Sequence, residues 1–392
     1  MIPSRSQRSF DRRAALKVGA GLAAAASGLP SAAARAAQPA TPVATPTATD
    51  PVARAVPHVF ADDDFEFQFL IALGQTYERA ADVGECFAVA AAIPDGDADA
   101  WFDAFFALAE RIRPAAEASD AAGQTTSARD AYLRAATYYA QASFFADATR
   151  DPARLIPTWE AQRAAFDAFA ARLDPPAEPV QIPYEGVTLP GYALTVDASG
   201  APRPWVIMNN GSDGTASDMW SQGAAAALRR GYNALIFDGP GQGAALYRQG
   251  LVFRPDWENV IRPVVDWLLT RGDVDPTRIA IIGVSQGGYW VPRAVAFERR
   301  IAAAIADPGV MDVATIYNQY IPPDALQALM SATGDELTQI ANEIDQGAAA
   351  EAAKNPRLAF TLAFRLRPYG TSSFAQALRL VNAYNLRGVV GQ

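Results

Sequence analysis

Short apolar segments alternate with helical patterns in the second half of the chain, and this alternation restricts the fold more than any other feature. Pro175-Pro176 ends a run of helical patterns, because proline lacks the N–H group that a helix interior requires. Residues 180–184 and 189–196 then flank Glu185-Gly186, which predicts a β-hairpin. The further predicted strands are residues 205–208, 233–237, 278–283 and 302–306. Short buried strands with helices between them predict an α/β domain with a mostly parallel sheet, covered on both faces.

A serine lies on a sharp turn between one of these strands and the helix that follows it. The segment Gly283-Val284-Ser285-Gln286-Gly287 places a glycine two positions away on either side of Ser285. A serine at the top of a strained strand-to-helix turn needs such small neighbours, because larger ones would clash. We therefore predict that Ser285 is a catalytic nucleophile, and a purely structural glycine turn is the alternative.

Two backbone N–H groups are candidates for binding an anion beside Ser285. The helix after Ser285 presents its N-terminus, where N–H groups stabilise a developing oxyanion, and the N–H of Gln286 is the first candidate. Residues 209–214 follow another strand, at the position where enzymes with such a serine turn supply the second donor. The sequence therefore predicts an oxyanion hole made of the backbone N–H groups of Gln286 and Ser212.

A glycine-rich segment follows the strand predicted over residues 233–237. It runs from Asp238 to Gly243 and contains Gly239-Pro240-Gly241, which we interpret as a turn that brings the backbone close to the site. It is not a dinucleotide-binding fingerprint, because that requires G-x-G-x-x-G leading into a helix and an acidic residue about 20 positions later. The sequence predicts no cofactor.

The chain before Pro175-Pro176 carries helical patterns without a fixed repeat. Apolar residues between Trp101 and Ile112 recur at helical spacing, and Asp97 or Asp99 is placed to cap the start of that helix. Two more helices are predicted over residues 126–145 and 158–173. Uneven spacing of the helix starts indicates a single helical domain and not an array of repeats.

These segments resemble a known family. Those that carry the resemblance are residues 210–214, 237–243 and 283–293, with 80–85, 95–101 and 132–145 upstream. The first three are similar to the α/β-hydrolases, for which the serine turn is specific. The upstream helices resemble a subgroup in which a helical cap precedes the hydrolase domain, the FrsA-like esterases and 2,6-dihydroxypseudooxynicotine hydrolases. The similarity covers most of the chain after the first 60 residues.

The resemblance implies a serine-dependent hydrolase that acts on an ester or on the C–C bond of a β-dicarbonyl substrate. It also implies a pocket for this small molecule between the cap and the sheet. The domains are then a helical cap over residues 57–176 and an α/β-hydrolase domain over residues 177–392. Pairing into a homodimer is one arrangement that the resemblance allows.

The chain departs from the family in its catalytic acid and histidine. In α/β-hydrolases both follow the serine, whereas no histidine follows His58 here. We expect that the sequence lacks the last strands of the sheet, and with them both residues. Asp307 as a relocated acid is a less favoured alternative, and we interpret His58 as a solvated residue. A catalytically silent hydrolase-like binding protein is the alternative function.

An export signal is predicted over residues 1–37. Arg12 and Arg13 precede a weakly apolar run over residues 18–29, and Ala34-Arg35-Ala36 offers a small-residue cleavage site. This order resembles a twin-arginine signal, in which the export machinery reads Arg12 and Arg13. The apolar run is too short to span a bilayer. The predicted location is periplasmic or extracellular.

Composition narrows the classes of partner. Residues 38–56 are mainly Pro, Ala and Thr and predict a disordered linker.

The net charge is −9, and cleavage after Ala36 would remove six basic residues and one acidic residue, leaving −14. An acidic protein of this kind repels nucleic acid and anionic lipid. One cysteine, Cys86, and one histidine exclude an internal disulfide and a metal site built from several such residues.

Overall fold

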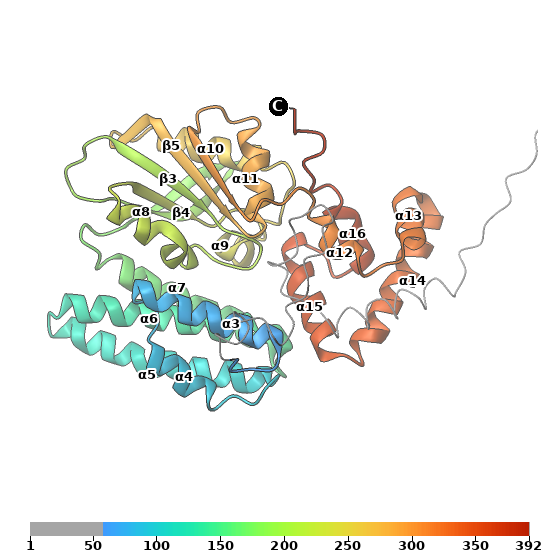
Figure 1. The fold of residues 1–392 in the computed structure, drawn as a ribbon, viewed down its shortest axis with the longest axis horizontal. Coiled ribbons are helices and arrows are strands. Elements are labelled where there is room, and N and C mark those ends of the chain that lie inside the picture. The colour runs from blue at the N-terminus through green and yellow to red at the C-terminus, as the bar shows by residue number, and fades with distance from the viewer. Residues whose placement is uncertain (1–57, 392) are drawn as a thin grey trace, which may run out of the picture. The chain divides into compact units, whose positions relative to one another are not determined.

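The computed structural model describes residues 58–391, coloured in Figure 1. The predicted export signal with Arg12 and Arg13, and the predicted linker over residues 38–56, lie outside the described residues. Among the residues that are described, no helix combines the length and the apolar character needed to cross a membrane. The described chain forms two compact units, one of residues 58–311 with 386–391 and one of residues 312–385.

Five helices make up the first part of the larger unit. They are α3 (Asp63–Gly74), α4 (Val83–Ala90), α5 (Ala98–Ala121), α6 (Thr125–Phe144) and α7 (Leu155–Ala170). Three of them begin at an aspartate that caps the helix, Asp62, Asp82 or Asp97, because its carboxylate accepts hydrogen bonds from N–H groups of the first turn. The sequence offered either Asp97 or Asp99 as the cap of α5, and the structure shows that the cap is Asp97.

The core of these helices is aromatic. Four large aromatic side chains are all buried there: Trp101, Tyr138, Tyr139 and Trp159. Cys86 is also buried, and burial raises the pKa of its thiol to about 11, so the thiol stays protonated near neutral pH. On the same helix as Cys86, Glu85 accepts a hydrogen bond of 2.8 Å from the Tyr138 hydroxyl and pairs with Arg134.

The second part of this unit is a sheet with six strands among the described residues. They are β1 (Glu178–Tyr184), β2 (Val187–Leu194), β3 (Arg203–Asn209), β4 (Asn233–Phe237), β5 (Val274–Val284) and β6 (Ala303–Asp307). Their order is β1-β2-β4-β3-β5-β6, and β3, β4 and β5 are labelled in Figure 1. β1 and β2 form the predicted hairpin, with φ of 42° at Glu185 and 83° at Gly186, as a tight two-residue turn requires. β2 is antiparallel to β4, and the pairs from β4 to β6 are parallel.

Helices between the parallel strands cover both faces of the sheet. They are α8 (Ala225–Arg229), α9 (Gly243–Tyr247), α10 (Glu258–Leu268) and α11 (Gly287–Val295). The chain steps from β3 to β4 in one direction and from β4 to β5 in the other. Right-handed crossovers therefore put α8 on one face and α10 on the opposite face. β6 lies at the sheet edge, where Ile305 is 55% exposed.

Residues 312–385 form a helical unit of their own. Its helices are α12 (Ala314–Asn318), α13 (Pro323–Ser331), α14 (Gly334–Ala352), α15 (Pro356–Leu366) and α16 (Phe374–Val381). Asp312 and Asn385 pair as an isolated antiparallel bridge, so the two ends of the unit lie side by side.

Candidate active site

Four loops meet at one edge of the sheet, because the strands that precede them are parallel neighbours. β3 ends at Asn209, β4 leads into Asp238, β5 leads into Ser285 and β6 ends at Asp307. In sheets of this type, ligands bind outside the carboxyl ends of the strands. The predicted residues Ser285, Gln286 and Ser212 all follow strands that end at this edge.

Ser285 sits in the strained conformation that the sequence predicts. Its φ is +56°, in the left-handed region that non-glycine residues rarely adopt. Tight packing around the turn, residues 283–288, imposes this conformation. A Cβ at Gly283 would lie 2.2 Å from the carbonyl oxygen of Gly287, and a Cβ at Gly288 would lie 1.7 Å from that of Pro308. We call residues 283–288 the serine turn.

Ser285 is half-buried and is held from two sides. Its N–H donates to the carbonyl oxygen of Asp307 at 2.7 Å, so this N–H is not available to an anion. On the other side, a Cβ at Gly211 would lie 2.7 Å from the Cβ and 3.3 Å from the Oγ of Ser285. Gly211 is therefore required at its position, and the loop after β3 passes directly over the serine.

The two predicted anion donors lie next to these contacts. Gln286 is buried and immediately precedes the first residue of α11, at the positive end of that helix. Ser212 follows Gly211, and its hydroxyl donates to Asp213 at 2.5 Å. The structure thus brings residues adjacent to both candidates, Gly211 and Ser285, into contact.

The loop after β3, residues 210–218, is held by hydrogen bonds from side chains, and we call it the β3 loop. The amide of Asn210 donates to the carbonyl oxygen of Thr215 at 2.7 Å and accepts from the N–H of Gly211 at 2.7 Å. From the cap helix α7, the buried Gln162 Nε2 donates to Thr215 Oγ1 at 2.9 Å and Ser217 Oγ at 2.7 Å. The cap therefore contacts the loop that lies over Ser285.

Asp238 is a buried carboxylate that joins three elements. Its Oδ1 accepts from the N–H of Ala216 at 2.7 Å, and its Oδ2 accepts from the N–H of Ala244 at 2.9 Å. Burial raises the pKa of Asp238, while Arg163 of α7, 3.6 Å from Oδ2, acts in the opposite direction. Asp238 thus ties the β3 loop to the start of α9 and to the cap.

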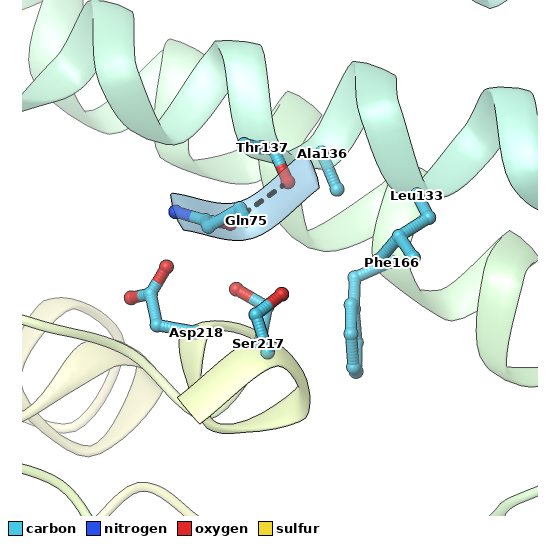
Figure 2. A pocket seen from close by; sticks show the side chains of 8 residues that line it. Gln75, Leu133, Ala136, Thr137, Phe166, Ser217 and Asp218 are labelled. Atoms are coloured by element: carbon cyan, nitrogen blue, oxygen red, sulfur yellow. Dashed lines mark hydrogen bonds between the residues drawn. The ribbon is translucent and has the colours of Figure 1, made fainter. Parts of the chain in front are cut away.

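A small hollow lies where the cap helices meet the β3 loop (Figure 2). It measures about 210 Å³ with its mouth included, and its lining residues are Gln75, Leu133, Ala136, Thr137, Phe166, Ser217, Asp218 and Ser221. Burial raises the pKa of Asp218 to about 6. Ser285, Gln286 and Ser212 are not among the lining residues, so this hollow is not the catalytic pocket that the resemblance implies.

The candidates for an acid and a base lie as follows. His58 is exposed, as predicted, and its Nδ1 lies 3.6 Å from Glu66 Oε1 at the start of α3. The backbone of Asp307 contacts Ser285, but its side chain is exposed. Among residues 58–391, no group of three or more His, Cys, Asp or Glu side chains is arranged to hold a metal ion.

Gln242, after β4, also contacts the β3 loop, since its Nε2 donates to the carbonyl oxygens of Asn210 and Gly211. Sequence reasoning missed Gln162, Asp238 and Gln242 as parts of this site. Asp238 and Gln242 carried a signal, since polar residues directly follow a fully buried strand and precede a helix. Gln162 carried none, because a glutamine on a helix is ordinary in sequence. Only its burial against Thr215 and Ser217 distinguishes it.

Comparison with known proteins places these features in context. Residues 225–354 match the model of the prolyl oligopeptidase family. The Aspergillus aculeatus hydrolase acrC is 33% identical over 350 residues, which cover 84% of this chain and 80% of that protein. The 20-hydroxy-prefusarin hydrolase FUS2 of Gibberella moniliformis is 38% identical over 272 residues, covering 67% of this chain and 65% of that protein.

Two further comparisons, one with a protein sequence and one with a crystal structure, also match hydrolases. The Fusarium hydrolase LUC6 is 36% identical over 274 residues, covering 68% of this chain and 65% of that protein. The crystal structure of the 2,6-dihydroxy-pseudo-oxynicotine hydrolase aligns with a TM-score of 0.61 at 22% identity. That alignment covers 81% of this chain and 77% of the other. At this identity, the structural match speaks for the fold alone.

Proposed function

Because the chain belongs to the α/β-hydrolase superfamily, and is a hydrolase by its relatives, we propose that it is a serine-dependent hydrolase with Ser285 as the nucleophile. The observation that carries the proposal is the strained φ of +56° at Ser285, directly beneath Gly211. A strained residue persists only where its surroundings impose it, and such positions cluster at active sites. The proposal extends to an ester, or the C–C bond of a β-dicarbonyl compound, as the bond cleaved.

In the proposed reaction, Ser285 Oγ attacks the carbonyl carbon of the substrate. A bond forms between Oγ and that carbon, and the carbonyl π electrons move onto oxygen as an oxyanion. The backbone N–H groups of Gln286 and Ser212 stabilise this charge, and the dipole of α11 adds to it. The leaving group then departs with the electrons of its bond and takes up the proton that Ser285 Oγ has lost. Water next adds to the acyl carbon, which leaves as the carboxylic acid while Ser285 Oγ regains a proton.

The general base is not assigned to a residue of this sequence. The one histidine, His58, is exposed and paired with Glu66 on the cap. Without a base, attack by serine is slow, and release of the acyl group, which also needs a base, is slow as well. An activated ester is therefore expected to leave Ser285 acylated for long enough to be observed.

This expectation gives the test. Incubation of the protein with p-nitrophenyl acetate should add the mass of one acetyl group, located on the peptide that contains Ser285. Ser285→Ala should remove the label, whereas Ser199→Ala, an exposed serine in the loop between β2 and β3, should keep it. Acetylation elsewhere, or none on a folded protein, would contradict the proposal and favour the alternative of a catalytically silent binding protein.

A further inference from the structure

Gln242 is a buried amide whose polar atoms all bind backbone. It lies in the turn between β4 and α9 and is 2% exposed. Its Nε2 donates to the carbonyl oxygens of Asn210 at 2.9 Å and Gly211 at 2.7 Å. Its Oε1 accepts from the N–H of Gly239 at 2.9 Å. The bond to Gly239 fixes which way the amide faces, because the two ends of the side chain cannot exchange without losing all three bonds.

The bond to Gly211 sets the direction of the next N–H. A trans peptide is planar, so its C=O and N–H groups point in opposite directions. The carbonyl of Gly211 and the N–H of Ser212 belong to one peptide. When Gln242 holds that carbonyl on its own side, the N–H of Ser212 points away from Gln242. The Cα of Gly211 in this peptide is packed against Ser285.

The preceding peptide is fixed as well. Its carbonyl, that of Asn210, also accepts from Asn209 Nδ2 at 2.9 Å, and its N–H, that of Gly211, donates to Asn210 Oδ1 at 2.7 Å. Rotation of the Gly211–Ser212 peptide is therefore opposed on one side by Gln242 and on the other by the fixed Asn210–Gly211 peptide.

We propose that Gln242 is a positioning residue for catalysis: it holds the peptide that aims the N–H of Ser212 at the oxyanion formed on Ser285. This inference rests on the proposed function and adds a residue to it. The polar atoms of Gln242 bind backbone groups of residues 210, 211 and 239, so it acts through the peptide that it holds. Its loss therefore weakens binding of the transition state and leaves binding of the substrate ground state unchanged.

Gln242→Glu is the sharpest test, because it keeps shape and volume. One carboxylate oxygen still accepts from the N–H of Gly239. The other carboxylate oxygen now faces the two carbonyl oxygens of Asn210 and Gly211, and acceptors that face one another repel. The peptide is expected to turn away. The rate constant for acetylation of Ser285 should fall about 100-fold, as for loss of one oxyanion donor, with the half-saturating ester concentration changed less than about twofold.

Lowering the pH should partly restore the activity of this variant. Protonation of the introduced carboxylate would restore one O–H donor toward the carbonyls, so the rate of Gln242→Glu relative to wild type should recover as the pH falls. Gln242→Met removes the donor without a titratable group and should be slow at every pH. Gln249→Glu makes the same chemical change on an exposed glutamine that binds the carbonyl of Thr188, and should match wild type.

The outcomes separate the two proposals. If wild-type Ser285 is not acetylated, the proposed function fails and this inference fails with it. If wild type is acetylated and folded Gln242→Met, which has neither a donor nor a titratable group, reacts at the same rate, only the positioning role is overturned. A reduced fraction of reactive protein with an unchanged rate constant would also overturn it, since this would mean that Gln242 serves folding alone. If Gln242→Glu does not fold, Gln242→Met gives the decision by its rate constant.

Discussion

The serine turn and the β3 loop meet at Ser285, yet they are held in different ways. The serine turn is fixed by contacts between backbone atoms, which leave no room for a side chain at Gly283 or Gly288. The β3 loop is fixed by side-chain amides that come from other elements, Gln162 from the cap and Gln242 from the turn after β4. The proposed nucleophile is thus held by steric exclusion, and the candidate anion donor is held by hydrogen bonds.

The largest effect is expected in the serine turn. Gly288→Ala would place a Cβ 1.7 Å from the carbonyl oxygen of Pro308, and a backbone atom cannot move aside as a flexible side chain can. We expect a loss of at least about 3 kcal/mol of unfolding free energy, at the upper end of overpacking effects. Chemical denaturation measures it.

Gly309→Ala is the matched control for that substitution. It lies next to Pro308, but a Cβ there would meet nothing within 4 Å. Its unfolding free energy should stay within about 0.5 kcal/mol of wild type. Equal stability of the two variants would show that steric exclusion does not hold the serine turn.

A smaller effect is expected where the cap meets the β3 loop. Gln162→Leu removes a buried donor from Thr215 Oγ1 and Ser217 Oγ, and each lost bond costs about 1 kcal/mol. We expect about 2 kcal/mol of destabilisation, together with slower acetylation of Ser285, measured on the same samples.

The control for the cap contact lies on the same helix. Glu160 pairs with Arg248 across the boundary between cap and sheet, but this pair is exposed. Glu160→Gln should cost less than about 1 kcal/mol and leave the acetylation rate unchanged. If both variants slow acetylation equally, general attachment of the cap, and not the bond to the β3 loop, determines the rate.

The smallest effect is a difference in pH response. The serine turn contains no ionisable side chain, whereas the β3 loop ends in Asp218, whose pKa burial raises from 3.8 to about 6. Between these values the folded protein keeps a proton that the unfolded chain has lost. This carboxyl group therefore lowers stability as the pH rises from about 4 to 6.

Asp218→Asn should weaken that decline. The amide keeps an oxygen for the N–H of Thr215 but does not titrate. Because Asp218 retains some accessible surface, the expected gain at pH 7 is on the order of 1 kcal/mol, vanishing near pH 4. Thermal unfolding across this range measures it. A constant difference between variant and wild type would contradict the raised pKa.

The same contrast explains what the sequence could predict. The strands, the hairpin at Glu185-Gly186 and the turn at Ser285 were predictable, because short-range sterics and apolar patterns determine them. The bonds of the β3 loop were not, because Gln242 lies 31 positions from Gly211 and Gln162 lies 53 positions from Thr215. Which amide reaches which carbonyl depends on how the elements pack, and no local pattern encodes it.

Asp238 has a consequence for the motions of the protein. It binds the amide protons of Ala216 and Ala244, both in the sheet domain, and lies beside Arg163, which belongs to the cap. A bonded amide proton exchanges with deuterium only when its bond opens. Undocking of α7 would remove the counter-charge and loosen both bonds together. Deuterium uptake at these two alanines therefore reports how often the cap lifts away.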